Sequence, residues 1–313
     1  MTSDLLLKQA MQGFYLARRA DGYSPDTIRQ YDWALSRWAT FTGDKPINAI
    51  TIDDARKFIV YLQTDYGNLS PVSIFHGWKA IRAFYKWLDT EGLAPNVMVN
   101  LKKPPFRASE ISPLSNADID KLLKASTTIN HKDAKKEYDR RAPHGERNRL
   151  LILFLLDTGL RVGEFCRLNV EDLNMDTCEV SVKPFQSSRK SKPRTVYIGK
   201  RVQKELWRYL LSRDRTIQRD PLFLSERGNR MTVDSINHLL LRIAARAGVS
   251  NVHPHIFRHT FSIQYIRNGG DIFTLQKLLG HASLEMVKYY LHVAQVDMES
   301  AHRRASPVDN WRL

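Results

Sequence analysis

Four polar residues near the end of the 313-residue chain carry side chains suited to phosphate chemistry. His255 and Arg258 lie three residues apart, so a helix would project both from one face. His281 follows Leu-Gly, and Tyr290 comes nine residues later. An arginine fork binds phosphate oxygens and keeps its charge, and a tyrosine can act as a nucleophile through a covalent intermediate. In this order, the four residues predict a site where a phosphate is stabilised while a tyrosine attacks it.

A second arginine occurs earlier, in Gly159-Leu-Arg161-Val-Gly-Glu164. Arg161 follows a glycine that we expect to end one helix, and it lies near the start of the next, where backbone amides also favour anions. Glu164 is one turn further on and is expected to hold Arg161 or His255 in place. Taken singly, each residue also suits an ordinary role, such as an intrahelical ion pair, a core histidine or a core tyrosine. The prediction therefore depends on the ordered set.

The charge of the chain indicates a polyanion as its partner. The formal net charge is +15, while the 42% of hydrophobic residues is typical of a globular protein. Residues 1–110 contain 14 Lys and Arg against 11 Asp and Glu, and the remainder contains 34 against 22. We therefore expect the second part to bind DNA or RNA more strongly, with a solvated basic surface as the alternative.

Cysteine usage and the N-terminus favour a cytoplasmic protein. Cys166 and Cys178 are the only cysteines and have no ligand-like spacing, so we expect neither a disulfide framework nor structural zinc. The first residues lack the basic segment of a secretory signal. The longest apolar run, Leu150 to Leu156, is far too short to span a bilayer, so we expect no membrane association.

The first hundred residues carry clear helix-start signals. Ser24-Pro25 and Ser70-Pro71 each place a serine at the N-cap and a proline at the first helical position. Apolar residues then recur at three- and four-residue spacing, and we expect the aromatic ones to form a core rather than to stack on bases. The patterns predict four helices, over about residues 4–19, 26–40, 51–62 and 71–91. A polar, proline-containing linker follows over 102–113.

The remainder is predicted to be helical around a small antiparallel sheet. Residues 178–183 and 194–198 alternate apolar and polar side chains, as half-buried strands do, and a basic loop joins them. Leu222 to Leu224 is a candidate third strand. The polar stretch 127–147 is predicted to be a surface loop or a frayed helix. Helices are expected from residue 115, and over about 148–158, from 162, and over 202–213, 233–247, 255–268, 272–279 and 284–293.

Taken together, these motifs resemble those of the tyrosine recombinases, also called phage integrases. The resemblance covers essentially the whole chain, and its motifs are Gly-Leu-Arg161-x-x-Glu164, a basic hairpin, His255-x-x-Arg258-His259, Leu-Gly-His281 and Tyr290. It implies a mainly α fold with a small antiparallel β-sheet, in which two domains clamp duplex DNA. The expected division is a four-helix core-binding domain over 1–101, a linker over 102–113, an α+β catalytic domain over 114–296 and a C-terminal helix and tail over 297–313.

The resemblance also implies a role for each residue. Tyr290 would attack a DNA phosphate, forming a 3′-phosphotyrosyl link and freeing a 5′-hydroxyl. Arg161 and Arg258 would hold the non-bridging oxygens. His255 would help to take the proton of the tyrosine or support the transition state, and His281 would donate a hydrogen bond to the phosphate. The covalent link conserves the phosphodiester energy, so no cofactor, ATP or metal is expected.

A lysine on the hairpin would protonate the leaving 5′-oxygen. In relatives it lies in the turn between the strands, often in a Gly-Lys-Gly setting that this chain lacks. Lys190 is our choice, while Lys192 and Lys183 remain alternatives and Arg189 lies near the usual place.

The resemblance implies double-stranded DNA core sites as the substrate and a synaptic homotetramer as the active assembly. A helix over about 297–305, with Trp311 and Leu313 beyond it, is expected to anchor the tail in a neighbouring subunit or on the same one. Two alternatives use the same fold or a similar catalytic set: a type IB topoisomerase, and a catalytically silent DNA-binding regulator. The target sequence, the direction of reaction and any accessory proteins are not readable from these residues.

Overall fold

The chain divides into two compact units, Met1–Glu110 and Ile111–Leu313, and each has its own hydrophobic core. The structure is a computed structural model. It describes residues 5–64, 67, 69–105, 112–132, 137–184, 193–213, 220–280, 285–294, 302–303, 306 and 308–309, and for 130–132, 137–139 and 285–286 it describes the backbone alone.

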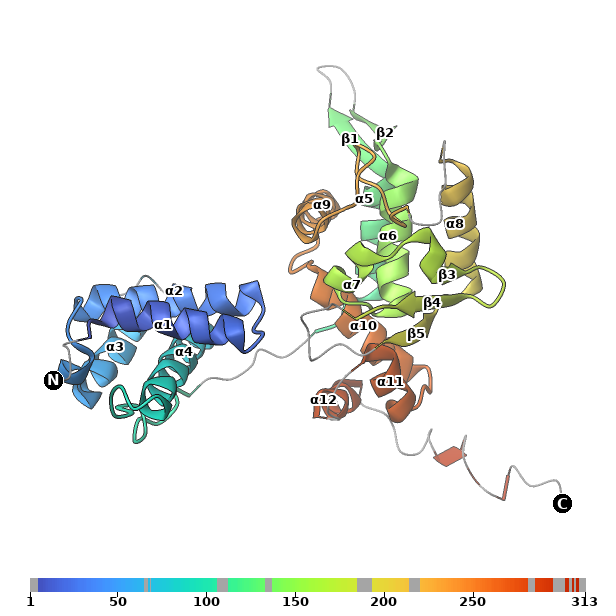
Figure 1. Ribbon diagram of the computed structural model, residues 1–313. Coiled ribbons are helices and arrows are strands. Elements are labelled where there is room, and N and C mark those ends of the chain that lie inside the picture. Colours follow the sequence, from blue (N-terminus) through green and yellow to red (C-terminus); the bar gives the residue numbers. More distant parts are fainter. Residues whose placement is uncertain are drawn as a thin grey trace. The chain divides into compact units, whose positions relative to one another are not determined.

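Within its described residues, the first unit contains four α-helices, as predicted (Figure 1). The serines of the two Ser-Pro pairs act as N-caps: Ser24 accepts a hydrogen bond from the Thr27 amide at 3.3 Å, and Ser70 accepts one from the Ser73 amide at 3.2 Å. In each case proline takes the first helical position, where no intrahelical amide bond is lost. The helices are α1 Leu7–Ala20, α2 Pro25–Thr42, α3 Ile52–Thr64 and α4 Pro71–Thr90.

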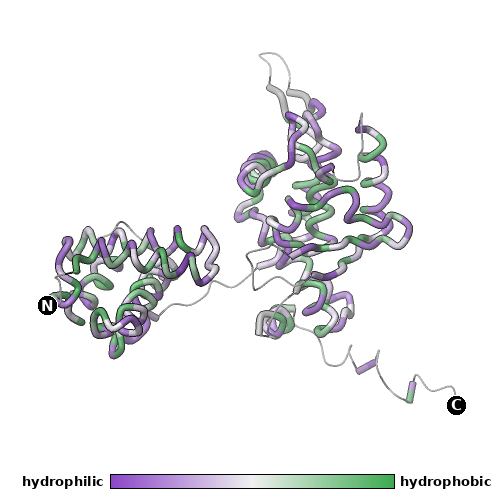
Figure 2. Tube along the Cα trace, viewed as in Figure 1, coloured by the Kyte–Doolittle hydropathy of each residue, from purple (hydrophilic) through white to green (hydrophobic). Residues whose placement is uncertain are grey.

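Aromatic side chains fill the core of the first unit. Trp38, Phe84 and Tyr85 are fully buried. The rings of Trp38 and Phe58 meet edge to face with centroids 5.1 Å apart, and those of Phe14 and Phe84 do so at 5.5 Å. In Figure 2, hydrophobic and hydrophilic residues alternate along these helices, as expected when one face of each helix packs inward. The aromatic residues therefore form a core, as predicted, and not a stacking surface.

The second unit is mainly helical with two small antiparallel sheets. Helix α6 Gly145–Thr158 lies at its centre and packs against α5 Asn116–Thr127, α8 Lys200–Leu211 and α10 Pro254–Arg267. The apolar residues of α6 are buried on most of its circumference, as expected for a central helix. The remaining helices are α7 Val162–Arg167, α9 Val233–Ala247, α11 Ile272–Leu279 and α12 Glu285–Ala294.

A three-stranded sheet carries the predicted hairpin. Strand β4 Glu179–Val182 pairs antiparallel with β5 Arg194–Tyr197, with Val180 opposite Val196. Both valines are buried, so the period-two pattern in the sequence reports the inward face correctly. The third strand is β3 Leu173–Asn174, which pairs with the other edge of β4.

Two sequence predictions are wrong in this unit. Leu222 to Leu224 do not form the third strand: Leu222 and Phe223 are both buried, without the alternation of a strand, and only isolated bridges occur at Pro221 and Leu224. The stretch 127–147 is neither a loop nor a frayed helix, because it contains the antiparallel strands β1 Thr128–Lys132 and β2 Glu137–Arg141. These two strands pair through backbone hydrogen bonds. Because their side chains are mostly polar, the sequence shows no apolar alternation that would predict them.

Most of the predicted helix ends agree with the structure to within three residues, and α9 and α11 agree fully. The glycine stops at Gly159, Gly248 and Gly280 all adopt the left-handed conformation that ends a helix. Trp311, Leu313 and most of the expected helix over 297–305 lie outside the described residues.

The second core provides a matched test of packing. Leu240 and Leu241 are neighbours on α9, but Leu240 is fully buried and Leu241 is 57% exposed. We expect Leu240→Ala to lower the free energy of unfolding by about 3 kcal/mol, because it opens a cavity. Leu241→Ala should change it by less than about 0.5 kcal/mol. Urea unfolding followed by circular dichroism measures both, and equal effects would contradict the assigned burial.

Candidate active site

Arg161 and Glu164 form the first part of the site. Helix α6 ends at Thr158 with Gly159 as its C-cap, and Arg161 is the N-cap of α7. The Glu164 carboxylate accepts a hydrogen bond from the backbone amide of Arg161 at 2.9 Å and another from its guanidinium at 3.1 Å. Glu164 is buried, whereas the Arg161 side chain is 36% exposed. The carboxylate therefore fixes the base of an arginine whose side chain still reaches solvent.

A second arginine, Arg194 on β5, binds the same carboxylate. Its two terminal nitrogens lie 2.9 and 2.7 Å from the Glu164 oxygens, and its Nε donates to the Leu278 carbonyl at 2.7 Å. The Arg194 side chain is only 7% exposed. Gly280 lies directly against it, since a Cβ at Gly280 would come within 3.2 Å of the arginine side chain. Arg194 thus ties the hairpin to α7 and to the end of α11.

No catalytic motif of the sequence includes Arg194. One signal was present: Arg194, Val196 and Ile198 occupy alternate positions, so they share a face of the strand, and the two apolar residues are buried. A charged residue on an inward face needs a partner, because an unpaired buried charge is costly. That reasoning predicts a buried carboxylate near Arg194, although not which one.

Arg258 on α10 is buried and held by two backbone carbonyls. Its terminal nitrogens donate to the Gly159 and Leu279 carbonyls, both at 2.7 Å. Burial, followed by the nearby charge of Arg161, lowers the pKa of Arg258 to about 9, so the guanidinium remains charged at neutral pH. The ends of α6 and α11 therefore orient a cation that lies close to the first arginine.

Tyr290 on α12 is nearly fully buried in a small apolar cluster. It is 1% exposed and packs among residues of α10, α11 and α12, including Ile263 and Leu279. Desolvation raises the pKa of Tyr290, and the positive charges of Arg258 and Arg161 partly oppose that rise. The hydroxyl is therefore protonated at neutral pH and lies within the field of both arginines. Tyr289 is half-buried against the same cluster.

Among the histidines that the structure describes, His259 contacts the Tyr290 hydroxyl, while the sequence pattern assigns proton transfer or transition-state support to His255. His259 Nδ1 lies 2.8 Å from the Tyr290 hydroxyl, and the ring of His255 is 6.5 Å from the ring of His259. His255 is exposed, and its pKa is lowered by desolvation and then by Arg258 and His253. The sequence places His259 in the His-x-x-Arg-His motif but does not predict its contact with Tyr290, because that contact depends on how α12 packs against α10.

Several predicted residues lie outside the described part of the chain: Lys190, Lys192, Arg189 and His281. Lys183, the remaining lysine candidate, follows β4 and is 64% exposed. Its ammonium group lies 2.6 Å from Asp172 and 3.3 Å from Glu171, and these bonds raise the pKa of Lys183. Two acidic partners favour its charged form and make Lys183 a poor proton donor compared with a lysine lacking them.

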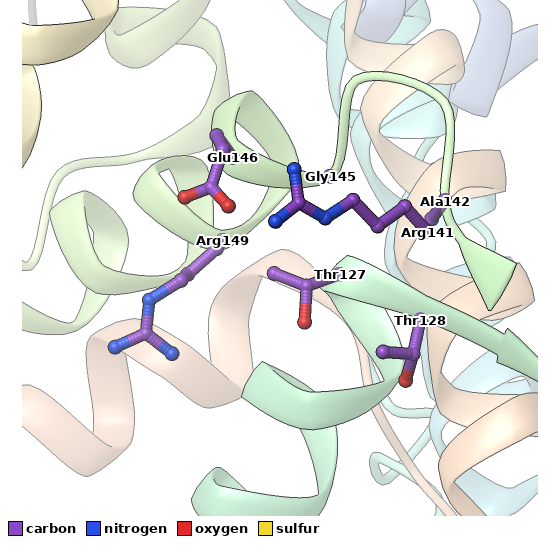
Figure 3. A pocket seen from close by; sticks show the side chains of 7 residues that line it. All are labelled: Thr127, Thr128, Arg141, Ala142, Gly145, Glu146 and Arg149. Carbon is purple, nitrogen blue, oxygen red and sulfur yellow. The ribbon is translucent and has the colours of Figure 1, made fainter. Parts of the chain in front are cut away.

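A pocket of about 380 Å³ lies away from these residues (Figure 3). It is lined by Arg141, Glu146 and Arg149, among others, at the start of α6. Gly159 follows the other end of this 14-residue helix, roughly 20 Å away by helix rise. The residues gathered around Arg258 therefore do not share this pocket.

The residues that the structure describes were compared with the requirements of a metal site and of a membrane-spanning helix. Within the ranges given above, no cluster of three or more His, Cys, Asp or Glu side chains has a geometry that would hold a metal ion. In the same ranges, no helix combines the length and apolar character that a membrane crossing requires.

The Glu164 carboxylate should make stability depend on pH. Burial raises its pKa, but the bonds from Arg194 and Arg161 outweigh burial and lower the pKa to about 2. The folded pKa thus lies below the unfolded value of 4.5, so the contribution is complete above about pH 4.5 and is lost as the pH falls towards 2. We expect Glu164→Gln to cost about 3 kcal/mol at pH 7, because it leaves Arg194 buried without a counter-charge.

Urea unfolding of wild type and Glu164→Gln at several pH values tests this expectation. The difference should shrink below pH 4.5, and Glu226→Gln, at an exposed position of the same unit, should show none at pH 7. A pH-independent difference would mean that packing, and not charge, accounts for the loss.

Comparison with known proteins matches both units. The family model described as "Phage integrase family" matches residues 112–296, which is more than half of the chain. The model described as "Phage integrase, N-terminal SAM-like domain" matches residues 11–93. Tyrosine recombinase XerC of Staphylococcus saprophyticus is 26% identical, covering 94% of this chain and 95% of its own. Tyrosine recombinase XerA of Pyrococcus furiosus is 29% identical, covering 99% and 98%.

Solved structures share the fold. The Tn1549 transposon integrase in complex with a circular intermediate DNA has a TM-score of 0.74 at 18% identity, covering 97% of this chain and 99% of that one. The XerH recombinase bound to a palindromic difH substrate has a TM-score of 0.69 at 21% identity, covering 97% and 85%. With both units matched and the arginines, histidines and tyrosine in the family's order, the chain belongs to the phage integrase family of tyrosine-type site-specific DNA recombinases.

Proposed function

We propose that this recombinase cuts and rejoins duplex DNA with Tyr290 as its nucleophile, forming a 3′-phosphotyrosyl link and freeing a 5′-hydroxyl. The observation that carries the proposal is the position of the Tyr290 hydroxyl, which is bonded to His259 and lies in the field of Arg258 and Arg161. A phenol in such a site has an acceptor for its proton and cations for the phosphate that it attacks. Exchange of phosphodiesters through this link conserves their energy, so ATP is not needed.

The two arginines differ in how they would hold the phosphate. Arg258 is fixed by the Gly159 and Leu279 carbonyls, so it reaches its position without reorganisation during the reaction. Arg161 is anchored at Glu164 but exposes about a third of its side chain, which leaves it able to close on bound DNA. We assign both to the non-bridging oxygens, and His255 and His281 to the support of the same phosphate.

The assembly and the division of labour are also proposals. We assign residues 1–101 to binding of core DNA, 114–296 to catalysis, and 297–313 to a tail that acts between subunits or within one. The excess of positive charge beyond residue 110 and the DNA-bound states of the Tn1549 integrase and XerH support duplex DNA as the substrate. We further propose a synaptic tetramer acting in the cytoplasm.

The N-terminal match argues against the topoisomerase alternative, because it identifies a phage integrase domain in front of the catalytic unit. A silent regulator is disfavoured because hydrogen bonds hold Arg161 and Arg258 in place and the Tyr290 hydroxyl is bonded to His259. A strand-exchange assay with two distinguishable duplexes separates all three activities.

Tyr290→Phe should abolish covalent capture of DNA while leaving DNA binding intact, because it removes only the attacking oxygen. The assay uses a nicked, partly randomised duplex pool in EDTA, with denaturing gels and sequencing of the linked DNA. Tyr289→Phe is the control, since Tyr289 occupies the next position on the same helix, and it should form adduct at the wild-type rate. Loss of adduct with Tyr289→Phe alone would move the nucleophile to that residue.

Lys190→Ala should slow cleavage by about 100-fold or more, as loss of a general acid does. Lys183→Ala should reduce it far less, because the Lys183 ammonium is bonded to Asp172 and Glu171. Cleavage rates on the sites recovered from the duplex pool measure both effects. Wild-type cleavage by Lys190→Ala would remove Lys190 from the site and direct attention to Lys192.

A further inference from the structure

His259 contacts the nucleophile more closely than the family motif alone suggests. Its Nδ1 lies 2.8 Å from the Tyr290 hydroxyl, and the centroids of the two rings are 5.6 Å apart. The contact joins α10 to α12, which pack against each other. A phenol has a single proton, and at this distance a neutral imidazole nitrogen is a suitable acceptor for it.

The surroundings of His259 keep its ring neutral in the free protein. Desolvation, followed by the neighbouring His255, lowers the pKa of His259 to about 4, so the ring has a nitrogen lone pair at neutral pH. Among the described side chains, the titratable and charged groups that act on the contact come from α10 and its N-cap, from the N-cap of α7 and from α12: His253, His255, Arg258, Arg161 and Tyr289.

We propose that His259, and not His255, accepts the proton of Tyr290 when the tyrosine attacks the DNA phosphate. The proposal rests on the function assigned above to Tyr290. His255 is exposed and the centroids of its ring and the His259 ring are 6.5 Å apart, whereas it is the His259 ring that contacts Tyr290. His259 thus joins the site as a catalytic residue, because it bonds the reacting oxygen.

The step balances without an external reactant. As the Tyr290 oxygen bonds to phosphorus, its proton moves to Nδ1 and His259 becomes an imidazolium. The bond from phosphorus to the 5′-oxygen breaks, and that oxygen takes a proton from the general acid, for which we have proposed Lys190. On rejoining, the 5′-hydroxyl attacks the phosphotyrosine, the lysine recovers its proton, and His259 returns its own proton to Tyr290.

Bound DNA makes the transfer easier. The positive charges of Arg258 and Arg161 act on Tyr290 in this structure. A DNA phosphate at these arginines brings negative charge, and a nearby opposite charge raises the pKa of an imidazole. The low pKa of His259 therefore describes the resting protein. The base becomes stronger when the substrate arrives.

A substitution that keeps the hydrogen bond but not the basicity separates proton transfer from positioning. The amide oxygen of His259→Gln can still accept from Tyr290, but glutamine cannot take up the proton. We expect His259→Gln to form adduct with the nicked duplex pool at least about 100-fold more slowly than wild type at pH 7, with DNA binding unchanged. His292→Gln, at an exposed position on the same helix as Tyr290, is the control and should behave as wild type.

The pH profile supplies a readout that a structural role would not change. Without its base, the His259→Gln variant should react faster with rising pH, because ionisation of Tyr290 then supplies the nucleophile. In ¹⁵N-histidine-labelled protein, Tyr290→Phe should shift the Nδ1 resonance of His259, because this nitrogen loses the hydrogen bond from the Tyr290 hydroxyl. The resonances of His255 should stay nearly unchanged.

Each outcome is decisive. Wild-type adduct formation by His259→Gln would overturn the proposal and leave His259 as a residue that only orients the hydroxyl. An unshifted His259 resonance in Tyr290→Phe would show that the contact is absent in solution, which also overturns it. Absence of adduct from wild-type protein that binds the pool would overturn the nucleophilic role of Tyr290, and the base with it.

Discussion

One buried carboxylate organises the site. Glu164 accepts four hydrogen bonds from two arginines, so its charge is compensated where it would otherwise be costly to bury. Arg161 and Arg194 come from different elements, and through them Glu164 joins the start of α7 to the hairpin. Without this anion, two cations would lie close to Arg258 with nothing between them. The positive site for a DNA phosphate therefore depends on a negative charge beneath it.

The second organising feature is the use of helix ends to orient a cation. A helix leaves its last carbonyls without intrahelical partners, and glycine ends the helix compactly. The carbonyls of Leu279, at the end of α11, and of Gly159, directly after α6, accept the two terminal nitrogens of Arg258. A Cβ at Gly159 would collide with the Phe261 ring, so the turn that presents this carbonyl has no room for a side chain. Packing and hydrogen bonding thus fix one arrangement of the arginine before any substrate binds.

Patterns among neighbouring residues predicted much of the fold. Contacts between residues far apart in the sequence were missed. Ser24, Ser70 and the glycine stops mark helix ends because a cap depends on residues within one turn. The alternation of apolar and polar residues around Val180 and Val182 marks a strand, and this pattern also depends only on near neighbours in the sequence. The contacts of Arg194 with Glu164 and Leu278 span 30 and 84 residues, and no local pattern carries them. The contact between His259 and Tyr290 likewise depends on helix packing, although the motif named both residues correctly.

The packing around Arg194 has a consequence for how this site evolves. Its guanidinium fills the space between the Glu164 carboxylate and Gly280, whose positive φ and missing Cβ leave room for it. A shorter residue at position 194 would leave the Glu164 carboxylate bonded to Arg161 alone of the two arginines, and it would open space beside Gly280. Positions 164, 194 and 280 therefore pack as one unit. Lineages that lose the arginine should replace the acid as well, so correlated changes at 164 and 194 would identify recombinases that stabilise the hairpin differently.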